Sequence, residues 1–126
     1  MANYYCILDL ETGGFDKDLN AITEVAFVIL DANLKEIDSY QTYIFPYGLE
    51  NGEGAIAVNG ITDEKIQNEG VPINDVAKQI RDKLKGYRDI IFVAHNAKFD
   101  FPFMHQFKTH GKVEIQGKFN PIQLCT

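Results

Sequence analysis

Three strand-like segments separated by short polar stretches occupy the first third of the chain. They span Tyr4 to Leu10, Ala21 to Leu30 and Glu36 to Phe45. The middle segment is mostly apolar, which is typical of a strand buried on both faces. Because short connections join antiparallel neighbours, we expect these segments to form an antiparallel meander.

The rest of the chain alternates helix and strand patterns. A short helix is expected at Ala55 to Val58, and Thr62 is a candidate cap of the next turn. The clearest helix follows Pro72, because four apolar residues recur on one helical face before Gly86: Ile73, Val76, Ile80 and Leu84. The stretch DIIFVA (residues 89–94) then predicts a buried strand.

The C-terminal stretch carries a second helical pattern. Three phenylalanines recur every four residues, at Phe99, Phe103 and Phe107, which predicts a helix with Pro102 in its first turn and Gly111 at its end. NPIQLCT (residues 120–126) predicts the beginning of a last strand. Strands followed by alternating helices and strands predict an α/β domain with a mixed sheet and flanking helices, formed by residues 1–126 as one domain.

The composition narrows the classes of function. A hydrophobic content of 45% suffices for a core, and no apolar run is long enough to span a membrane. We therefore expect a cytoplasmic protein with no membrane partner. A net charge of -6 opposes a broad basic surface for nucleic acid, so bound cations would have to attract a polyanionic substrate. Cys6 and Cys125 are not spaced for zinc or a disulfide framework, and we expect both to be buried thiols.

Two carboxylates mark the end of the first predicted strand, in the stretch DLETGG (residues 9–14). Asp9 and Glu11 point to the same face, because side chains alternate along a strand. Two anions this close favour a divalent cation, and hard oxygen ligands suit Mg²⁺ or Mn²⁺. Gly13 and Gly14 would let a substrate backbone approach. The alternative for so short a motif is a solvated strand end.

A further acid, Asp100, begins a helix that follows directly on a buried strand, in the stretch AHNAKFDFPF (residues 94–103). If that strand lies beside the first one, Asp100 reaches the same end of the sheet as Asp9 and Glu11. The three acids then form one candidate metal site.

DLETGG followed by HNAKFD (residues 95–100) resembles the first two motifs of the DnaQ-like, or DEDD-type, 3′-to-5′ exonucleases. That family includes the proofreading subunit of DNA polymerase III, RNase T and oligoribonuclease. AVNGIT (residues 57–62) resembles the family's HGIT stretch. The resemblance spans the chain from Tyr4 to Thr126 and implies an RNase H-like fold with a five-stranded sheet in the order 3-2-1-4-5.

The resemblance also implies the site. Asp9, Glu11 and Asp100 would be the catalytic residues and would hold two Mg²⁺ or Mn²⁺ ions that hydrolyse a phosphodiester bond. Thr12 would touch the terminal nucleotide, and Phe99 would line the pocket for its base. Gly13 stands where the family more often has Thr or Ser, and Asn59 stands where many members have His, although an amide still hydrogen-bonds a phosphate or sugar.

The family's third motif, with a histidine base and a fourth aspartate, is absent from this sequence. His95 belongs to the second motif, and His105 and His110 are candidates only as substitutes for the base. We therefore expect a domain truncated before its C-terminal helices, with weak or no hydrolysis. Candidate partners are a single-stranded DNA or RNA 3′ end, a DNA polymerase subunit, and a second copy of the chain.

Two other functions fit parts of the sequence. One is a noncatalytic module that keeps the fold to bind a nucleic-acid end or a polymerase. The other is a phosphatase of the haloacid-dehalogenase type, whose DxDxT motif is similar to DLET. Glu11 in place of the second aspartate, and the lack of a later paired-acid motif, argue against the phosphatase.

Overall fold

A mixed sheet of five strands organises this computed structural model, which describes residues 4–115 and 118–119. Three strands are antiparallel neighbours: β1 (Tyr4–Thr12), β2 (Ile22–Asp31) and β3 (Glu36–Tyr43). β4 (Ile90–Ala94) pairs with β1 in parallel, and the two-residue β5 (Lys118–Phe119) pairs with β4, giving the order β3-β2-β1-β4-β5. The expected α/β fold with a mixed sheet is confirmed.

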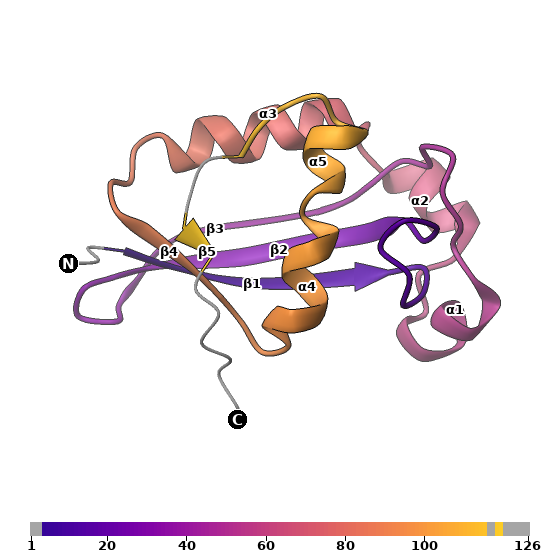
Figure 1. Ribbon diagram of the computed structural model, residues 1–126, viewed down its shortest axis with the longest axis horizontal. Helices are drawn as coiled ribbons and strands as arrows, with labels where there is room; N and C mark the ends of the chain where they lie inside the picture. The colour runs from indigo at the N-terminus through magenta and orange to yellow at the C-terminus, as the bar shows by residue number, and fades with distance from the viewer. Residues whose placement is uncertain (1–3, 116–117, 120–126) are drawn as a thin grey trace.

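The helices lie against the sheet and at one end of it. They are α1 (Glu53–Asn59), α2 (Asp63–Glu69), α3 (Ile73–Leu84), α4 (Ala97–Phe103) and α5 (Gln106–Thr109). α3 lies roughly along the strands, whereas α4 and α5 run across them, and α1 and α2 lie near the end where β1 finishes (Figure 1). None of the helices in the described ranges is long and apolar enough to cross a membrane.

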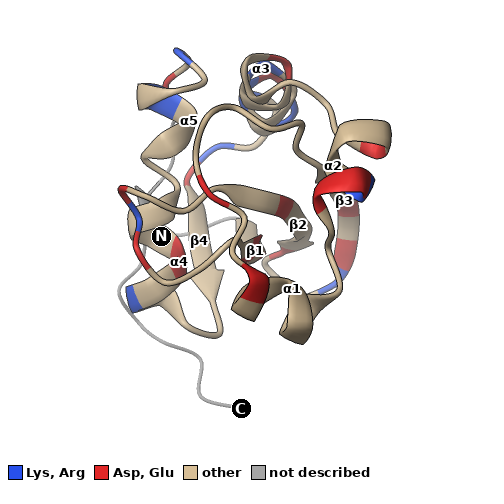
Figure 2. Ribbon diagram, turned by 90° about the vertical axis from the view of Figure 1, so that its right-hand side faces the viewer, with Lys and Arg blue, Asp and Glu red and all other residues tan. Residues whose placement is uncertain are grey.

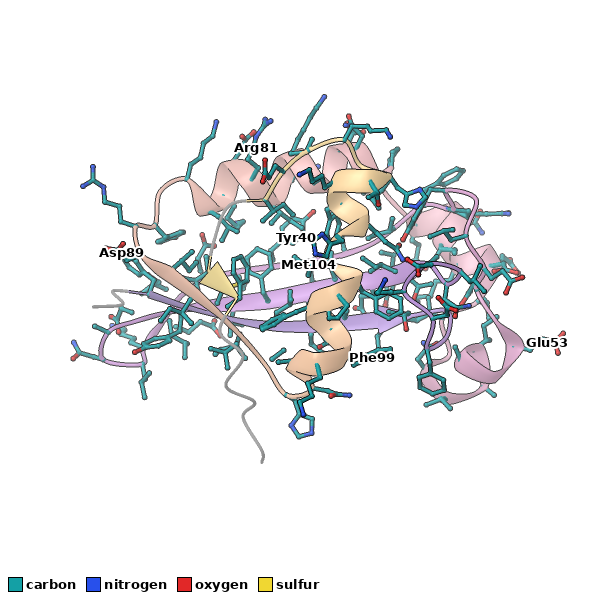
Figure 3. The ribbon with its side chains drawn as sticks, viewed as in Figure 1. Tyr40, Glu53, Arg81, Asp89, Phe99 and Met104 are labelled. Atoms are coloured by element: carbon teal, nitrogen blue, oxygen red, sulfur yellow. The ribbon has the colours of Figure 1, made fainter. Side chains whose placement is uncertain are left out.

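The core lies between the sheet and α3 to α5. Alternate residues of β1 are buried, and the apolar stripe predicted for α3 is buried against them: Cys6, Leu8 and Leu10 from the strand, and Ile73, Val76, Ile80 and Leu84 from the helix. Tyr40 lies between β3 and α3 and donates a hydrogen bond from its hydroxyl to Gln79 Oε1 at 2.7 Å (Figure 3). Burial raises the pKa of the Cys6 thiol, as expected for a buried cysteine.

Two predictions fall on the C-terminal residues. The strand predicted for NPIQLCT (residues 120–126) and the burial predicted for Cys125 both lie outside the described residues. The predicted cap of α2 is confirmed, because Thr62 Oγ1 accepts a hydrogen bond from the backbone N–H of Lys65 at 3.1 Å.

The single helix predicted around the phenylalanines is instead two short ones, and this part of the prediction is wrong. Pro102 lies near the end of α4, not in its first turn. Proline has no N–H to donate, so the α-helical bond from position 102 to Lys98 is absent, and α4 ends one residue later at Phe103. The next amides bond only three residues back, from Met104 to Phe101 and from His105 to Pro102, before α5 begins.

Candidate active site

The end of β1 extends beyond its parallel neighbour. β4 ends at Ala94, which pairs with Leu8, so the last residues of β1 have strand β2 on one side only. Strand alternation buries Leu8 and Leu10 and leaves Asp9 exposed and Glu11 partly exposed on the opposite face. The two carboxylates therefore lie at a free strand end, beside the first turn of α4.

Asp100 occupies the space that β4 leaves open. It comes from α4, is only 5% exposed, and its carboxylate accepts a hydrogen bond from the backbone N–H of Leu10. This hydrogen bond attaches α4 to β1 at Leu10, the residue between Asp9 and Glu11. Figure 2 looks onto this end of the molecule and shows the end of β1 between α4 and α1.

The charges of the three acids act on one another. The pKa of Asp100 is raised to about 7, first by burial and then by the charge of Asp9, with Glu11 adding a smaller effect and the Leu10 hydrogen bond opposing them. Burial, followed by the charges of Asp9 and Glu24, raises the pKa of Glu11, while a hydrogen bond from Asn59 lowers it. The structure thus brings Asp9, Glu11 and Asp100 into one electrostatic cluster.

The donor set of this cluster has the chemistry of a divalent-cation site. Carboxylate oxygens are the ligands preferred by Mg²⁺ and Mn²⁺, and a cation would relieve the repulsion that raises the pKa of Asp100 and Glu11. As the side chains stand, residues 4–115 include no group of three or more His, Cys, Asp or Glu arranged to hold a metal ion. The match between these three acids and a divalent cation therefore rests on residue type and charge, not on side-chain geometry.

A pocket of about 460 Å³ opens beside Glu11. It is built by the end of β1 and the following turn, by α1 with the residue preceding it, and by the first turn of α4. Its lining includes every residue that the sequence analysis assigned to substrate binding: Thr12, Gly13, Asn59 and Phe99. Figure 3 shows Phe99 at the beginning of α4 and Glu53 on α1. Most of the lining is apolar side chain or glycine backbone.

The polar residues of the pocket hold its walls together. Thr12 is 7% exposed and its hydroxyl donates to the Gly14 carbonyl at 2.6 Å. Asn59 Nδ2 donates to the Thr12 carbonyl at 3.3 Å, and Asn59 Oδ1 accepts from the Ile61 N–H at 2.9 Å. These bonds tie α1 to the end of β1, so both residues shape the pocket from within the protein.

The space beside Gly13 is not open to substrate, contrary to the expectation from the sequence. A Cβ atom there would lie 2.5 Å from Asn51 Cα and closer still to the carbonyl oxygen of Glu50. The space beside the Gly13 Cα is thus filled by the backbone of Glu50 and Asn51. The same segments are also joined by a hydrogen bond from the Gly52 N–H to the Gly13 carbonyl oxygen at 2.8 Å. Gly13 therefore lines the pocket with its backbone and leaves no extra space there for substrate.

The sequence alone gives two residues of this region no role in the site. Phe15 lines the pocket, is 92% exposed as a residue, and meets Phe99 edge-on with ring centroids 5.9 Å apart. The sequence signal for Phe15 is an aromatic residue within the otherwise polar, glycine-containing stretch GGFDKD (residues 13–18), where a core position is not expected. Glu24 pairs with Glu11 across β1 and β2 and accepts a hydrogen bond from Gln41 at 2.7 Å. No local pattern reveals that pairing, because it depends on strand register.

The three histidines are exposed and do not line the described part of the pocket. His110 follows α5, and its ring lies 5.5 Å from that of Tyr47. His105 immediately precedes α5, and His95 lies between β4 and α4. The geometry gives no support to His105 or His110 as a substitute base.

The raised pKa of Asp100 predicts a pH dependence of stability in a chelating buffer. The folded state binds the Asp100 proton more tightly than the unfolded state, so the free energy of unfolding should fall as pH rises from about 4 to about 7. The full shift corresponds to about 4 kcal/mol. Urea unfolding across this range, with EDTA present, measures the slope.

Asp100→Asn is the control for that prediction, because it removes the titrating group and keeps an oxygen for the Leu10 N–H. The difference between the two proteins isolates Asp100 from Glu11, whose pKa is also raised. Equal slopes in both proteins would contradict the assignment.

Comparison with known proteins relates this chain to a family. The sequence matches the RNase T exonuclease family over residues 6–125. A DNA polymerase III PolC-type from Listeria innocua is 37% identical over 118 residues, covering 94% of this chain and 8% of that protein. The 3′-5′ exonuclease DinG of Staphylococcus aureus is 35% identical over 100 residues, covering 79% of this chain and 10% of that protein.

The fold has a solved counterpart. The crystal structure of E. coli exonuclease I in complex with a dT13 oligonucleotide matches with a TM-score of 0.80 and 18% identity, over 89% of this chain and 25% of that one. This chain thus spans only a small part of these two relatives and of the solved structure. Since the family match covers nearly the whole sequence, the chain belongs to the DnaQ-like 3′-to-5′ exonuclease family.

Proposed function

We propose that this chain hydrolyses phosphodiester bonds at the 3′ end of a single-stranded nucleic acid. The observation that carries the proposal is that Glu11 belongs both to the acid cluster and to the lining of the pocket. A nucleotide seated in the pocket would have its phosphate beside the carboxylates. The names of the relative DinG and of the oligonucleotide-bound exonuclease I agree with this substrate class.

Asp9, Glu11 and Asp100 are the proposed ligands of Mg²⁺ or Mn²⁺. Bound cations would neutralise the phosphate and supply an activated water. The chain's own part is to hold the acids together at the end of β1 and to bury Asp100. Its overall charge of -6 repels a polyanion, so affinity for the substrate should require the divalent cation.

Phe15 and Phe99 are the proposed stacking surface for the terminal base. Both line the pocket and contact each other edge-on, and Phe99 also contacts the buried Phe103 with centroids 4.9 Å apart. Stacking accepts any base, so little sequence preference is expected. Thr12, Gly13 and Asn59 contribute the remaining pocket wall through their backbone and their hydrogen bonds.

Replacing Phe15 by Ala is expected to weaken binding of a short single-stranded oligonucleotide by about 10- to 100-fold, the usual loss for one stacked base. Stability should stay unchanged, because Phe15 is 92% exposed. Fluorescence anisotropy with a labelled oligothymidylate and Ca²⁺ measures the affinity. Phe45→Ala is the matched control, since Phe45 is 43% exposed and is not among the residues lining the described pocket. Equal losses in both variants would contradict the stacking role.

The direct test is a nuclease assay with a labelled single-stranded oligonucleotide and enzyme in excess. We expect mononucleotides to be released from a free 3′ hydroxyl in Mg²⁺ or Mn²⁺, and none from a 3′-blocked oligonucleotide or in EDTA. DNA and RNA oligonucleotides are compared in parallel. Without the histidine and aspartate of the family's third motif, hydrolysis should be slow, because loss of a general base costs about 10²- to 10⁴-fold.

Binding of the oligonucleotide without release of nucleotides in Mn²⁺ would contradict the enzymatic proposal. The chain would then act as a noncatalytic module that binds nucleic-acid ends. A DNA polymerase is the candidate partner in either case, because one relative is a DNA polymerase III PolC-type.

A further inference from the structure

The side chain of Gln106 is polar, 3% exposed, and bonded at each of its polar atoms. Its Nε2 donates to the carbonyl oxygens of Lys17 and Asn20, both at 2.8 Å. Its Oε1 accepts from the hydroxyl of Tyr47 at 2.5 Å, and that hydroxyl in turn accepts from the N–H of Ile22 at 2.6 Å. One side chain of α5 thus joins the segments that follow β1 and β3.

The segment held by Gln106 carries a wall of the pocket. Residues 13–21 connect β1 to β2, and Gly13, Gly14 and Phe15 within it line the pocket. The segment is braced internally, with the Asn20 N–H bonded to the Asp16 carbonyl and the Asp16 N–H bonded to Asn20 Oδ1. Phe15 itself projects with an almost fully exposed ring, so its position depends on this backbone.

Core packing alone does not account for Gln106. The next residue, Phe107, fills the core with an apolar side chain, and an apolar residue at position 106 would avoid burying an amide. A buried polar network is stable only when every member is satisfied, and here both N–H donors are satisfied by carbonyls of residues 13–21. The network therefore specifies where that segment sits relative to α5.

We propose that Gln106 is a positioning residue that fixes residues 13–21, and with them Phe15, at the mouth of the pocket. The functional part rests on the proposed 3′-end binding. Gln106 is not among the residues lining the described part of the pocket, and it acts through the backbone carbonyls of Lys17 and Asn20.

Gln106→Met tests the proposal, because methionine keeps the length and removes both donors. We expect the amides of residues 13–21 to exchange hydrogen at least about tenfold faster, as local opening becomes easier. The affinity for oligothymidylate should fall about tenfold, because a displaced Phe15 would lose part of the stacking energy of one base. In the nuclease assay, KM should rise by a similar factor while kcat stays within about twofold.

Phe107→Leu is the matched control on the same helix, because it perturbs a buried side chain that has no bond to residues 13–21. Tyr47→Phe is the second variant. It removes only the hydroxyl that bonds Gln106 and Ile22, and it should shift exchange and affinity in the same direction by less. It also keeps the test decisive if Gln106→Met does not fold.

Each outcome decides the proposal. Faster exchange confined to residues 13–21 with weaker binding in Gln106→Met and Tyr47→Phe supports it. Unchanged exchange, or equal changes in Phe107→Leu, overturns it and leaves Gln106 as a packing residue. If the unaltered chain binds no oligonucleotide, the proposed function fails, while hydrogen exchange still decides whether Gln106 fixes the segment.

Discussion

Replacing Asp100 by asparagine is expected to lower the release of nucleotides from a 3′ end by roughly 10³-fold. Asp100 is the buried member of the acid cluster, and its loss would weaken the charge stabilisation that the proposed cations would supply, which would amount to several kcal/mol. The variant should fold, because asparagine keeps an oxygen for the Leu10 N–H and removes the charge that burial disfavours. Its free energy of unfolding at pH 7 should even rise.

Single-turnover assays in Mn²⁺ measure the rate, and electron paramagnetic resonance of free Mn²⁺ measures the metal affinity. The matched control is Glu36→Gln, which removes the same charge from an exposed residue at the start of β3. We expect this control to retain activity and Mn²⁺ binding. If Asp100→Asn binds Mn²⁺ and hydrolyses the oligonucleotide as the unaltered chain does, the acid cluster is not the catalytic site.

Replacing Gly13 by alanine is expected to destabilise the folded state by about 3 kcal/mol, the upper range for overpacking a filled site. The new methyl group would meet the backbone of Glu50 and Asn51. Backbone cannot rotate away as a side chain can. The segment before α1 would have to move, and with it the bonds from the Gly13 N–H to Ala21 and from the Gly52 N–H to Gly13, each 2.8 Å long.

Gly54→Ala is the matched control, because Gly54 lines the same pocket yet a Cβ atom there has no neighbour within 4 Å. Gly54 lies in α1, where alanine should stabilise the helix by about 0.5 to 1 kcal/mol. Urea unfolding of both variants should therefore give changes of opposite sign. Equal changes would show that the packing around Gly13 is not as tight as the structure indicates.

Local patterns predicted much of the secondary structure correctly. The alternation in β1 and the apolar stripe of α3 are set by neighbours along the chain, and both elements appear close to their expected bounds. The helix around the phenylalanines is predicted less well, because four-residue spacing gives the correct burial of Phe103 and Phe107 but does not reveal the change to three-residue hydrogen bonds at Met104 and His105.

In the candidate site, too, some features follow from local sequence patterns and others do not. Alternation alone places Asp9 and Glu11 on one face of a strand, and the motif stretches were sufficient to propose Asp100 as their partner. The pairing of Glu24 with Glu11, the packing of Gly13 against Glu50, and the reach of Gln106 to residues 13–21 have no local signature.

These contacts join residues that are far apart in the sequence. Strand alternation and helical periodicity follow from backbone geometry, so amino-acid order is enough to reveal them. The pocket depends instead on which strands pair, in which register, and on how α1, α4 and α5 pack against the end of β1. Packing and hydrogen bonding across the whole core select that arrangement, and no short stretch of sequence carries enough information to specify it.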